Sequence, residues 1–416
     1  MSIVVQKFGG TSVTAEENII NVARKVIKTR SSGKDVVVVV SAMGKTTNTL
    51  LEMAHRINPN PYKRELDMLT STGEQVSIAL LTMAIQAQGY DAISFTGNQV
   101  GILTDNAYTK AKIIDIKKDR ILKELSDGKI VVVAGFQGVT EDGEITTLGR
   151  GGSDTTAVAL AAALKAEYCE IFTDVDGVFT ADPNVVPEAR KLHVVSYEEM
   201  LEMSSSGAKV LQLRSVEFGR MYKVLIHVRS TFNDEQGTWV IEEDERMEKA
   251  IISGVTYDKN QAKVTIYGLP DVPGIAARVF QTLADANINV DMIIQNVSKG
   301  EHSDISFTVD KEDLNQTLEV MGKVQNDLGA TSVDFDKDIA KVSLVGAGMR
   351  TNPGVAASMF TALAESKINI EMISTSPIKI SCVIRRDEVE KAIKSIHQKF
   401  ELQKDMRSDE YVKRMK

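Results

Sequence analysis

Cysteine is scarce in this chain of 416 residues, in which only Cys169 and Cys382 occur. Two cysteines so far apart cannot build a disulfide framework or a cysteine-rich zinc site, and the five scattered histidines do not supply one. We therefore expect no metal site of the protein's own and a reducing, cytoplasmic location. No apolar run approaches the roughly 20 residues that a membrane-spanning helix needs. Met1 leads directly into a predicted strand without a basic signal region, so neither membrane association nor secretion is expected.

Basic residues are also in the minority, since 49 lysines and arginines face 57 aspartates and glutamates and give a formal net charge of −8. Nucleic-acid-binding proteins usually carry a basic footprint, so a nucleic-acid partner is disfavoured. The hydrophobic fraction of 43% and the charged fraction of 25% are typical of a folded globular protein. A chain of this length predicts two or three domains.

Up to about residue 240, short β-branched runs alternate with longer helical patterns. Five consecutive valines at 36–40 predict a strand buried on both faces, and therefore a sheet with helices on both sides. The alternation is typical of βαβ units with a largely parallel sheet. An acidic stretch at 242–245 then indicates a linker or an exposed turn. The predicted strands are residues 3–5, 35–40, 130–134, 170–172 and 224–228, and the predicted helices are 16–28, 74–88, 155–166 and 196–203.

Beyond this stretch the sequence contains an internal repeat, which predicts two small α+β units of the same plan. Each copy reads as a strand, a Pro-Gly turn, a helix and further strands. Each copy alone would expose sheet edges, so the two are expected to pair. The matching segments are 263–268 with 341–346, Pro273-Gly274 with Pro353-Gly354, and 288–292 with 368–372.

The most informative turn lies at residues 4–12, where an apolar strand runs into Lys7, the pair Gly9-Gly10 and two hydroxyl residues. Glycines allow the backbone to approach an anion closely, and lysine adds a compact positive charge, so this order of residues suits a phosphate site. It is not a Walker A loop, because the spacing of that motif is absent. Ordinary packing of an α/β domain would explain the same turn.

A second glycine-rich segment, at 146–156, places Arg150 among three glycines ahead of an alanine-rich helical pattern. Arginine offers a bidentate fork for a carboxylate or a phosphate, while glycines keep bulk away from the ligand. Ser153 or Asp154 could instead cap the following helix, but an arginine flanked by three glycines is more than a cap requires.

Three further polar segments follow or adjoin predicted elements, at 41–48, 71–74 and 173–183. In an open α/β sheet, ligands collect beyond the carboxyl ends of the strands, so these segments predict a ligand site on one rim of the sheet. Each segment also has an explanation as a helix N-cap or a turn.

Taken in order, these motifs resemble those of the aspartate kinases of the amino-acid kinase superfamily, which carry paired regulatory ACT domains. The resemblance extends from the first strand to about Leu402. It rests on Lys-Phe-Gly-Gly-Thr-Ser, Ser-Thr-Gly-Glu, Gly-Arg-Gly-Gly-Ser-Asp, Thr-Asp-Val-Asp-Gly with Asp-Pro, and Gly-Ala-Lys-Val-Leu. It implies an α/β fold, a carbamate-kinase-like sandwich with a mainly parallel sheet, followed by two ferredoxin-like ACT domains. The implied divisions are a catalytic domain at 1–245, a first ACT domain at 263–338, a second at 247–262 with 339–402, and a flexible tail at 403–416.

The resemblance implies phosphoryl transfer from ATP, with Mg²⁺, to the β-carboxylate of L-aspartate. The product would be 4-phospho-L-aspartate, the first intermediate of the lysine, threonine and methionine branch. A side-chain carboxyl with a pKa of about 3.9 is already anionic near neutral pH, so no general base is required. Catalysis then consists of positioning two anions and neutralising charge on the transferring group.

The same resemblance implies roles for individual residues. Lys7, Arg150 and Asp154 would be catalytic, with Lys7 on the transferring phosphate and Asp154 holding Lys7. The nucleotide would be bound by Lys7, Phe8, Gly9, Gly10, Ser41, Thr173, Asp174, Phe179, Thr180, Ala181, Asp182, Pro183, Asn184 and Lys209. The substrate aspartate would be bound by Thr47, Glu74, Arg150, Gly151, Gly152 and Ser153, with Arg150 on its α-carboxylate and Glu74 facing its ammonium.

Two positions depart from the family pattern. Relatives often carry Asp-Pro-Arg where this chain has Asp182-Pro183-Asn184, which removes one cationic contact to the nucleotide, although Lys209 still offers charge. Many relatives have His-Pro where this chain has Gln212-Leu213, a change that we expect to affect packing only.

ACT domains of this family bind end-product amino acids, so lysine, threonine or both are the implied effectors. The implied effector residues are Asp271, Asn289, Val290, Asp291, Gln295, Asn369, Ile370, Ser374 and Thr375. A helix that passes into an edge strand would show the same pattern of asparagine and alternating apolar residues. The resemblance also implies a homodimer or larger assembly through the ACT domains, with a separate regulatory subunit if the internal Met247 is used as a start.

Two other functions stay open on the sequence alone, a sister amino-acid kinase with another substrate and a non-catalytic amino-acid sensor. The Ser-Thr-Gly-Glu segment and the duplicated ACT units argue against the first. The second predicts loss of the charged site residues, yet Lys7, Glu74, Arg150, Asp154 and Asp174 are all present.

Overall fold

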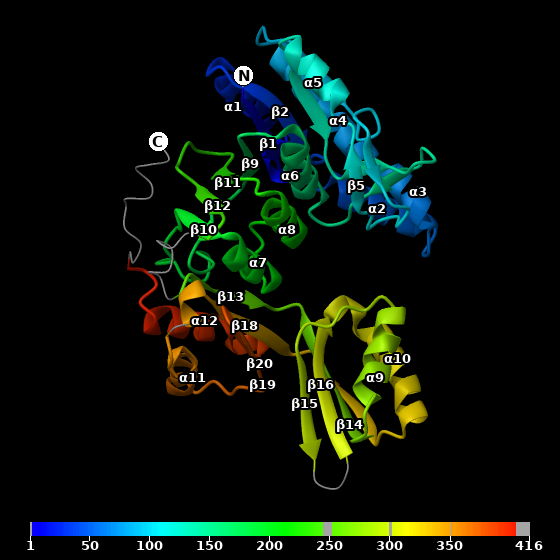
Figure 1. Ribbon diagram of the computed structural model, residues 1–416, viewed down its shortest axis with the longest axis vertical. Helices are drawn as coiled ribbons and strands as arrows, with labels where there is room; N and C mark the ends of the chain where they lie inside the picture. Colours follow the sequence, from blue (N-terminus) through cyan, green and yellow to red (C-terminus); the bar gives the residue numbers. More distant parts are fainter. Residues whose placement is uncertain (1, 244–251, 299–301, 351, 405–416) are drawn as a thin grey trace.

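The computed structural model describes residues 2–243, 252–298, 302–350 and 352–404. They form an N-terminal α/β domain and two smaller α+β units, which lie next to each other at one end of that domain (Figure 1). Met247 and the residues after Lys404 lie outside the described part, as do the last two residues of the acidic stretch at 242–245.

Eight strands form the sheet of the N-terminal domain, in the order β10-β12-β11-β9-β1-β2-β6-β3. All neighbouring pairs except β11 with β12 run parallel, which confirms the predicted, mainly parallel sheet. The strands are β1 (Ile3–Phe8), β2 (Asp35–Val40), β3 (Ala92–Phe95), β6 (Ile130–Ala134), β9 (Tyr168–Thr173), β10 (Val194–Ser196), β11 (Ile226–Ser230) and β12 (Thr238–Ile241).

Helices cover both faces of this sheet. Successive valines of β2 point to opposite faces, so each face presents apolar side chains that a helix layer buries. Val36, Val38 and Val40 pack with α1 and α4 on one face. Val37 and Val39 belong to a second core with α5, α6, α7 and α8 on the other. The helices are α1 (Glu16–Ser31), α4 (Thr72–Gln86), α5 (Asp119–Ser126), α6 (Gly152–Leu164), α7 (Tyr197–Ser205) and α8 (Leu213–Tyr222).

The N-terminal domain also contains a small second sheet that the sequence patterns did not predict, in the order β5-β4-β7-β8. Three of its strands have only three residues, too few to show the alternation that identifies a strand. Two helices before α4 were missed as well. The elements are β4 (Ile102–Thr104), β5 (Ile113–Ile116), β7 (Gln137–Val139), β8 (Ile145–Thr147), α2 (Thr46–Ile57) and α3 (Lys63–Thr70).

The start of α6 corrects one interpretation of the glycine-rich segment before it. Gly151 is the N-cap residue, with φ at 69° in the left-handed region, and makes no side-chain capping bond. Ser153 and Asp154 therefore stand in the first turn of the helix, and the interpretation of either as its cap is wrong. The helix instead presents Asp154 at its N-terminal end.

The two repeats fold into two four-stranded antiparallel sheets with helices on one side. The first sheet has the order β15-β16-β14-β17 and the second β13-β18-β20-β19, so β13 occupies the edge that β17 occupies in the first. Among the described residues, no helix is long and apolar enough to cross a membrane. The first unit contains β14 (Gln261–Pro270), α9 (Ile275–Asp285), β15 (Ile293–Ser298), β16 (His302–Asp310), α10 (Leu314–Leu328) and β17 (Ser332–Asp336). The second contains β13 (Gly254–Asp258), β18 (Ile339–Val345), α11 (Val355–Glu365), β19 (Met372–Ser376), β20 (Lys379–Arg385) and α12 (Val389–Lys399).

Candidate active site

The carboxyl ends of the parallel strands bring several of the polar turns to one edge of the large sheet. Because β1, β2, β6 and β9 are parallel neighbours, the residues that follow them meet at that edge. The Ser41 N–H donates to the Phe8 carbonyl at 3.1 Å, and the Gly135 N–H donates to the Val40 carbonyl at 3.0 Å. These bonds tie the ends of β1, β2 and β6 together.

A buried ion pair lies at this edge. The ammonium of Lys7, on β1, lies 2.6 Å from the carboxylate of Asp154, in the first turn of α6, and the two side chains are 11% and 9% exposed. Gly135 allows α6 to come this close, since a Cβ there would lie 2.6 Å from the Ser153 hydroxyl. The pair fixes a positive charge directly before the two glycines.

Gly9 and Gly10 are glycines for a steric reason. A Cβ on Gly10 would lie 2.9 Å from the Ala42 carbonyl oxygen, and a Cβ on Gly9 would lie 3.3 Å from the Lys7 ammonium. A 3₁₀ turn, η1 (Gly10–Val13), follows at once, so α1 begins only at Glu16. The bare backbone beside Lys7 leaves room for an anion.

Glu74 reaches the same edge from α4. Its side chain is only 2% exposed, and one carboxylate oxygen accepts a 3.0 Å hydrogen bond from the Ala42 N–H. The other oxygen, Oε2, is buried and has no hydrogen-bond partner among the described residues. Burial raises the pKa of Glu74 to about 7. A buried carboxylate oxygen without a donor suits the ammonium group of a ligand.

Arg150 and the glycines around it form an open loop between β8 and α6. The Arg150 side chain is 91% exposed, and its guanidinium lies 3.7 Å from the Glu312 carboxylate of the first repeat unit. Gly149 and Gly151 have φ values of 76° and 69°, which favour glycine. A Cβ on Gly151 would lie 2.0 Å from the Gln212 side chain, so the departure at Gln212 packs directly against this loop.

The remaining residues predicted to bind substrate or nucleotide form two groups. One group is at least partly exposed, and the other packs against the second repeat unit. Ser41, Thr47 and Thr173 are partly exposed, while Asp174 and Lys209 are exposed. The stretch at 179–184 instead joins the second repeat unit. Thr180 and Ala181 are 1% and 4% exposed, so their side chains face protein.

The contacts of this stretch are with β13 and α12. The Val255 N–H donates to the Thr180 carbonyl at 2.8 Å, and the Thr180 hydroxyl lies 3.0 Å from Nε2 of His397. The Tyr257 hydroxyl donates to Asp182 at 3.0 Å. Phe179 and Ala181 pack into the apolar core of the second unit. A change in the second unit therefore reaches this stretch directly.

The predicted effector residues lie on both repeat units. Asp271, Asn289 and Asn369 are exposed, and Gln295 lies on β15 while Ser374 and Thr375 lie on β19. Asp291 forms an ion pair with Lys341 of the second unit. Lys341 is 1% exposed, and its ammonium also donates to the Ser205 carbonyl of α7 at 3.3 Å. Lys341 thus joins all three parts of the chain, a role that the sequence did not reveal.

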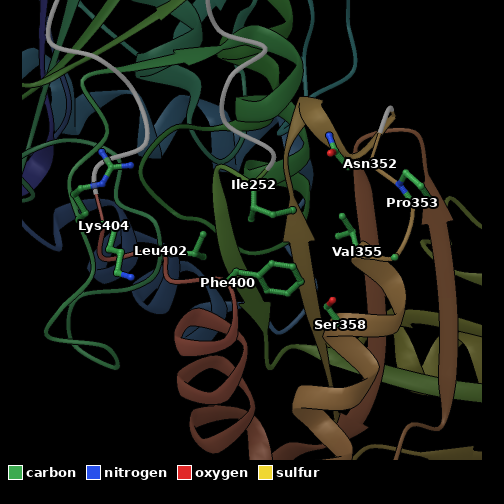
Figure 2. A pocket seen from close by; sticks show the side chains of 10 residues that line it. Ile252, Asn352, Pro353, Val355, Ser358, Phe400, Leu402 and Lys404 are labelled. Carbon is green, nitrogen blue, oxygen red and sulfur yellow. The ribbon is translucent and has the colours of Figure 1, made fainter.

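A cavity of about 300 Å³ lies in the second unit, at the start of α11 (Figure 2). Phe400 and Ile252 form apolar walls, and Val355 and Ser358 line it from α11. None of the residues placed beside Lys7 lines it. Its lining residues are Arg190, Ile252, Asn352, Pro353, Gly354, Val355, Ser358, Phe400, Leu402 and Lys404.

Comparison with known proteins agrees with this architecture. The model of the amino acid kinase family matches residues 2–230, and an ACT domain model matches residues 264–324 and 342–400. An aspartokinase of Mycolicibacterium smegmatis is 53% identical over 407 residues, which is 97% of each chain.

Two solved structures of Escherichia coli aspartokinase III share the arrangement. The complex with aspartate and ADP, described as the R-state, has a TM-score of 0.83 at 26% identity and covers 95% of this chain and 99% of that one. The complex with lysine and aspartate, described as the T-state, has a TM-score of 0.74 at 26% identity and covers 96% and 99%.

Proposed function

The chain belongs to the amino acid kinase family, within its aspartokinases, and we propose that it transfers a phosphoryl group from MgATP to the β-carboxylate of L-aspartate. The observation that carries this proposal is the Lys7–Asp154 pair beside Gly9 and Gly10, with Glu74 at the same sheet edge. The reaction forms a bond between a carboxylate oxygen and the γ-phosphorus, and ADP leaves. Aspartate is already ionised near neutral pH, so the protein has only to position two anions and offset their charge.

On the nucleotide side, Lys7 binds the transferring phosphoryl group and the glycine backbone approaches it. Asp154 keeps the Lys7 ammonium in place. Mg²⁺ enters with the nucleotide, as part of the MgATP substrate. The rest of the nucleotide is assigned to Ser41, Thr173, Asp174, residues 179–184 and Lys209, although the side chains of Thr180 and Ala181 are buried.

On the aspartate side, Arg150 binds the α-carboxylate through its bidentate fork, and the unpartnered oxygen of Glu74 receives the ammonium. Thr47 and Ser153 supply hydroxyl contacts near the start of α2 and α6. Gly151 and Gly152 keep the loop free of side chains there. The exposure of Arg150 fits a side chain that is free to turn toward a ligand.

The proposal includes feedback regulation by lysine, threonine or both at the ACT units. The lysine-bound T-state relative supports lysine binding in this architecture. The effector residues assigned are Asp271, Asn289, Val290, Asp291, Gln295, Asn369, Ile370, Ser374 and Thr375. A homodimer or larger assembly through the ACT units, and a cytoplasmic location in keeping with two buried free cysteines, belong to the same proposal.

The test is acyl-phosphate formation from L-aspartate and MgATP, trapped with hydroxylamine, with lysine and threonine added singly and together. We expect turnover with aspartate that falls with one or both amino acids. Turnover with another acceptor only would indicate a sister kinase. No turnover by a folded, ATP-binding protein would indicate a sensor.

A further inference from the structure

We propose that Asp67 is a positioning residue for the loop that carries Arg150. Asp67 lies on α3, and its side chain is completely buried. The proposal rests on the proposed function in one respect, the assignment of Arg150 to the substrate carboxylate. The hydrogen bonds by which Asp67 holds the loop do not depend on that assignment.

The Asp67 carboxylate accepts hydrogen bonds from three donors on two different segments. The Thr147 N–H donates to Oδ2 at 2.9 Å, and the Thr147 hydroxyl donates to Oδ1 at 2.6 Å. The Thr109 N–H donates to both oxygens, at 3.1 Å and 2.9 Å. Each oxygen is therefore shared between the two segments, which the carboxylate joins.

Both segments frame the loop. Thr147 is the last residue of β8, two positions before Gly149 and three before Arg150. Thr109 has φ at 70°, a left-handed conformation that a β-branched residue rarely adopts, and its carbonyl oxygen lies 3.0 Å from where a Cβ on Gly149 would be. The Asp67 carboxylate compensates for that conformation by receiving the Thr109 N–H.

Arg214 binds the same two segments, residues 109–111 and 147–148, which together form the stem of the loop. From α8, its guanidinium donates to the Leu148 carbonyl at 2.7 Å and to the Ala111 carbonyl at 3.1 Å. The Ala111 N–H donates to the Thr147 carbonyl at 2.9 Å. The N–H groups of Thr109 and Thr147 thus end on the Asp67 carboxylate, and the carbonyl groups of Leu148 and Ala111 on the Arg214 guanidinium. Such a stem holds the base of the loop, while the Arg150 side chain itself is exposed.

An ionised carboxylate suits this role better than an amide. Asp67 has no ion-pair partner among the described residues, and burial raises the pKa of its carboxyl, while the three donors lower it. Two carboxylate oxygens accept from all the donors at once. An asparagine would direct its own N–H₂ group at one of them, so it leaves a buried donor unpaired.

The test is the Asp67→Asn variant of the full chain. We expect the KM for aspartate to rise about tenfold, the size expected for lost bonds to a charged group. The KM for ATP should stay within twofold. Trypsin cleavage after Arg150, followed by mass spectrometry of the peptide that ends there, should become several times faster. The matched control is Asp105→Asn, because Asp105 accepts N–H bonds from Ala107 and Lys112 within the segment that carries Thr109, while Thr147 donates to Asp67 instead.

An unchanged KM for aspartate together with an unchanged cleavage rate would overturn the proposal. If the wild-type chain does not phosphorylate aspartate, the proposed function fails, and the cleavage rate alone decides the role of Asp67. If Asp67→Asn does not fold, Thr147→Val removes only the hydroxyl donor. We then expect a two- to threefold change in the same two readouts, and no change in either would count against the positioning role.

Discussion

The Lys7 ammonium, on β1, and the Asp154 carboxylate, in the first turn of α6, lie 2.6 Å apart. The two groups come from β1 and from a helix that begins almost 150 positions later in the chain, so the pair exists only in the folded domain. A cation held in this way is already oriented before a phosphoryl group arrives, which is the condition for electrostatic stabilisation of a transition state.

Replacing Lys7 by alanine should therefore remove turnover while the chain stays folded. We expect kcat to fall by at least about 100-fold, the usual loss when one oriented charge is removed from a reacting centre. Asp154 would be left almost buried without its cation, which costs roughly 3 kcal/mol of unfolding free energy. Steady-state kinetics and urea unfolding measure the two effects.

A double variant, Lys7→Met with Asp154→Asn, separates these effects. It removes both charges, so we expect stability to return toward that of the wild type while turnover stays lost. Near-normal turnover in Lys7→Ala would contradict the proposal that Lys7 binds the transferring phosphoryl group.

Replacing Arg150 by lysine should weaken aspartate binding with little effect on stability. Lysine keeps the charge but loses the planar fork that holds both carboxylate oxygens, so we expect the KM for aspartate to rise about tenfold and the KM for ATP to stay unchanged. The exposed contact with Glu312 contributes little to stability, because such pairs are worth at most about 1 kcal/mol. Initial rates at varied aspartate and fixed ATP measure this KM. An equal KM for aspartate in both proteins would contradict the binding of the substrate α-carboxylate by Arg150.

The sequence revealed those features that depend on neighbouring residues. The valines of β2 showed a doubly covered strand, and the match of 263–268 with 341–346 showed the repeat, because both signals lie within short windows. The role of Asp67 was not visible, since it depends on Thr109 and Thr147, which are distant in sequence. The same reason hid the attachment of residues 179–184 to the second ACT unit.

The raised pKa of Glu74 makes both stability and substrate binding depend on pH. With a pKa of about 7 in the folded chain against 4.5 when unperturbed, the folded protein keeps a proton that the unfolded chain loses between these values. The unfolding free energy should therefore fall as pH rises from about 4.5 to about 7, by roughly 3 kcal/mol.

Urea unfolding of wild type and Glu74→Gln across this pH range measures that effect, since the variant has no proton to lose at this position. A difference in unfolding free energy between the two proteins that stays constant across this pH range would contradict the raised pKa of Glu74. For the wild type we also expect the KM for aspartate to fall as pH rises through about 7, because the ionised carboxylate attracts the substrate ammonium.

The last prediction concerns inhibition and must separate two roles of Asp291. If Asp291 binds the effector ammonium, Asp291→Ala should raise the concentration for half-inhibition about tenfold, the loss expected for a charge-assisted bond. The same change also leaves Lys341 without its carboxylate, and Lys341 touches α7 of the catalytic domain. Lys341→Met is the control, because it breaks the pair while Asp291 remains.

Effector binding by Asp291 predicts a large shift in Asp291→Ala and a shift below about twofold in Lys341→Met. Coupling through the pair alone predicts equal shifts, since inhibition is a coupling free energy, about 1–3 kcal/mol in typical allosteric proteins, that either broken half would reduce. Dose–response curves with lysine and threonine, each at fixed aspartate, distinguish the two. Inhibition by both amino acids that survives unchanged in Asp291→Ala would place the effector site elsewhere on the ACT units.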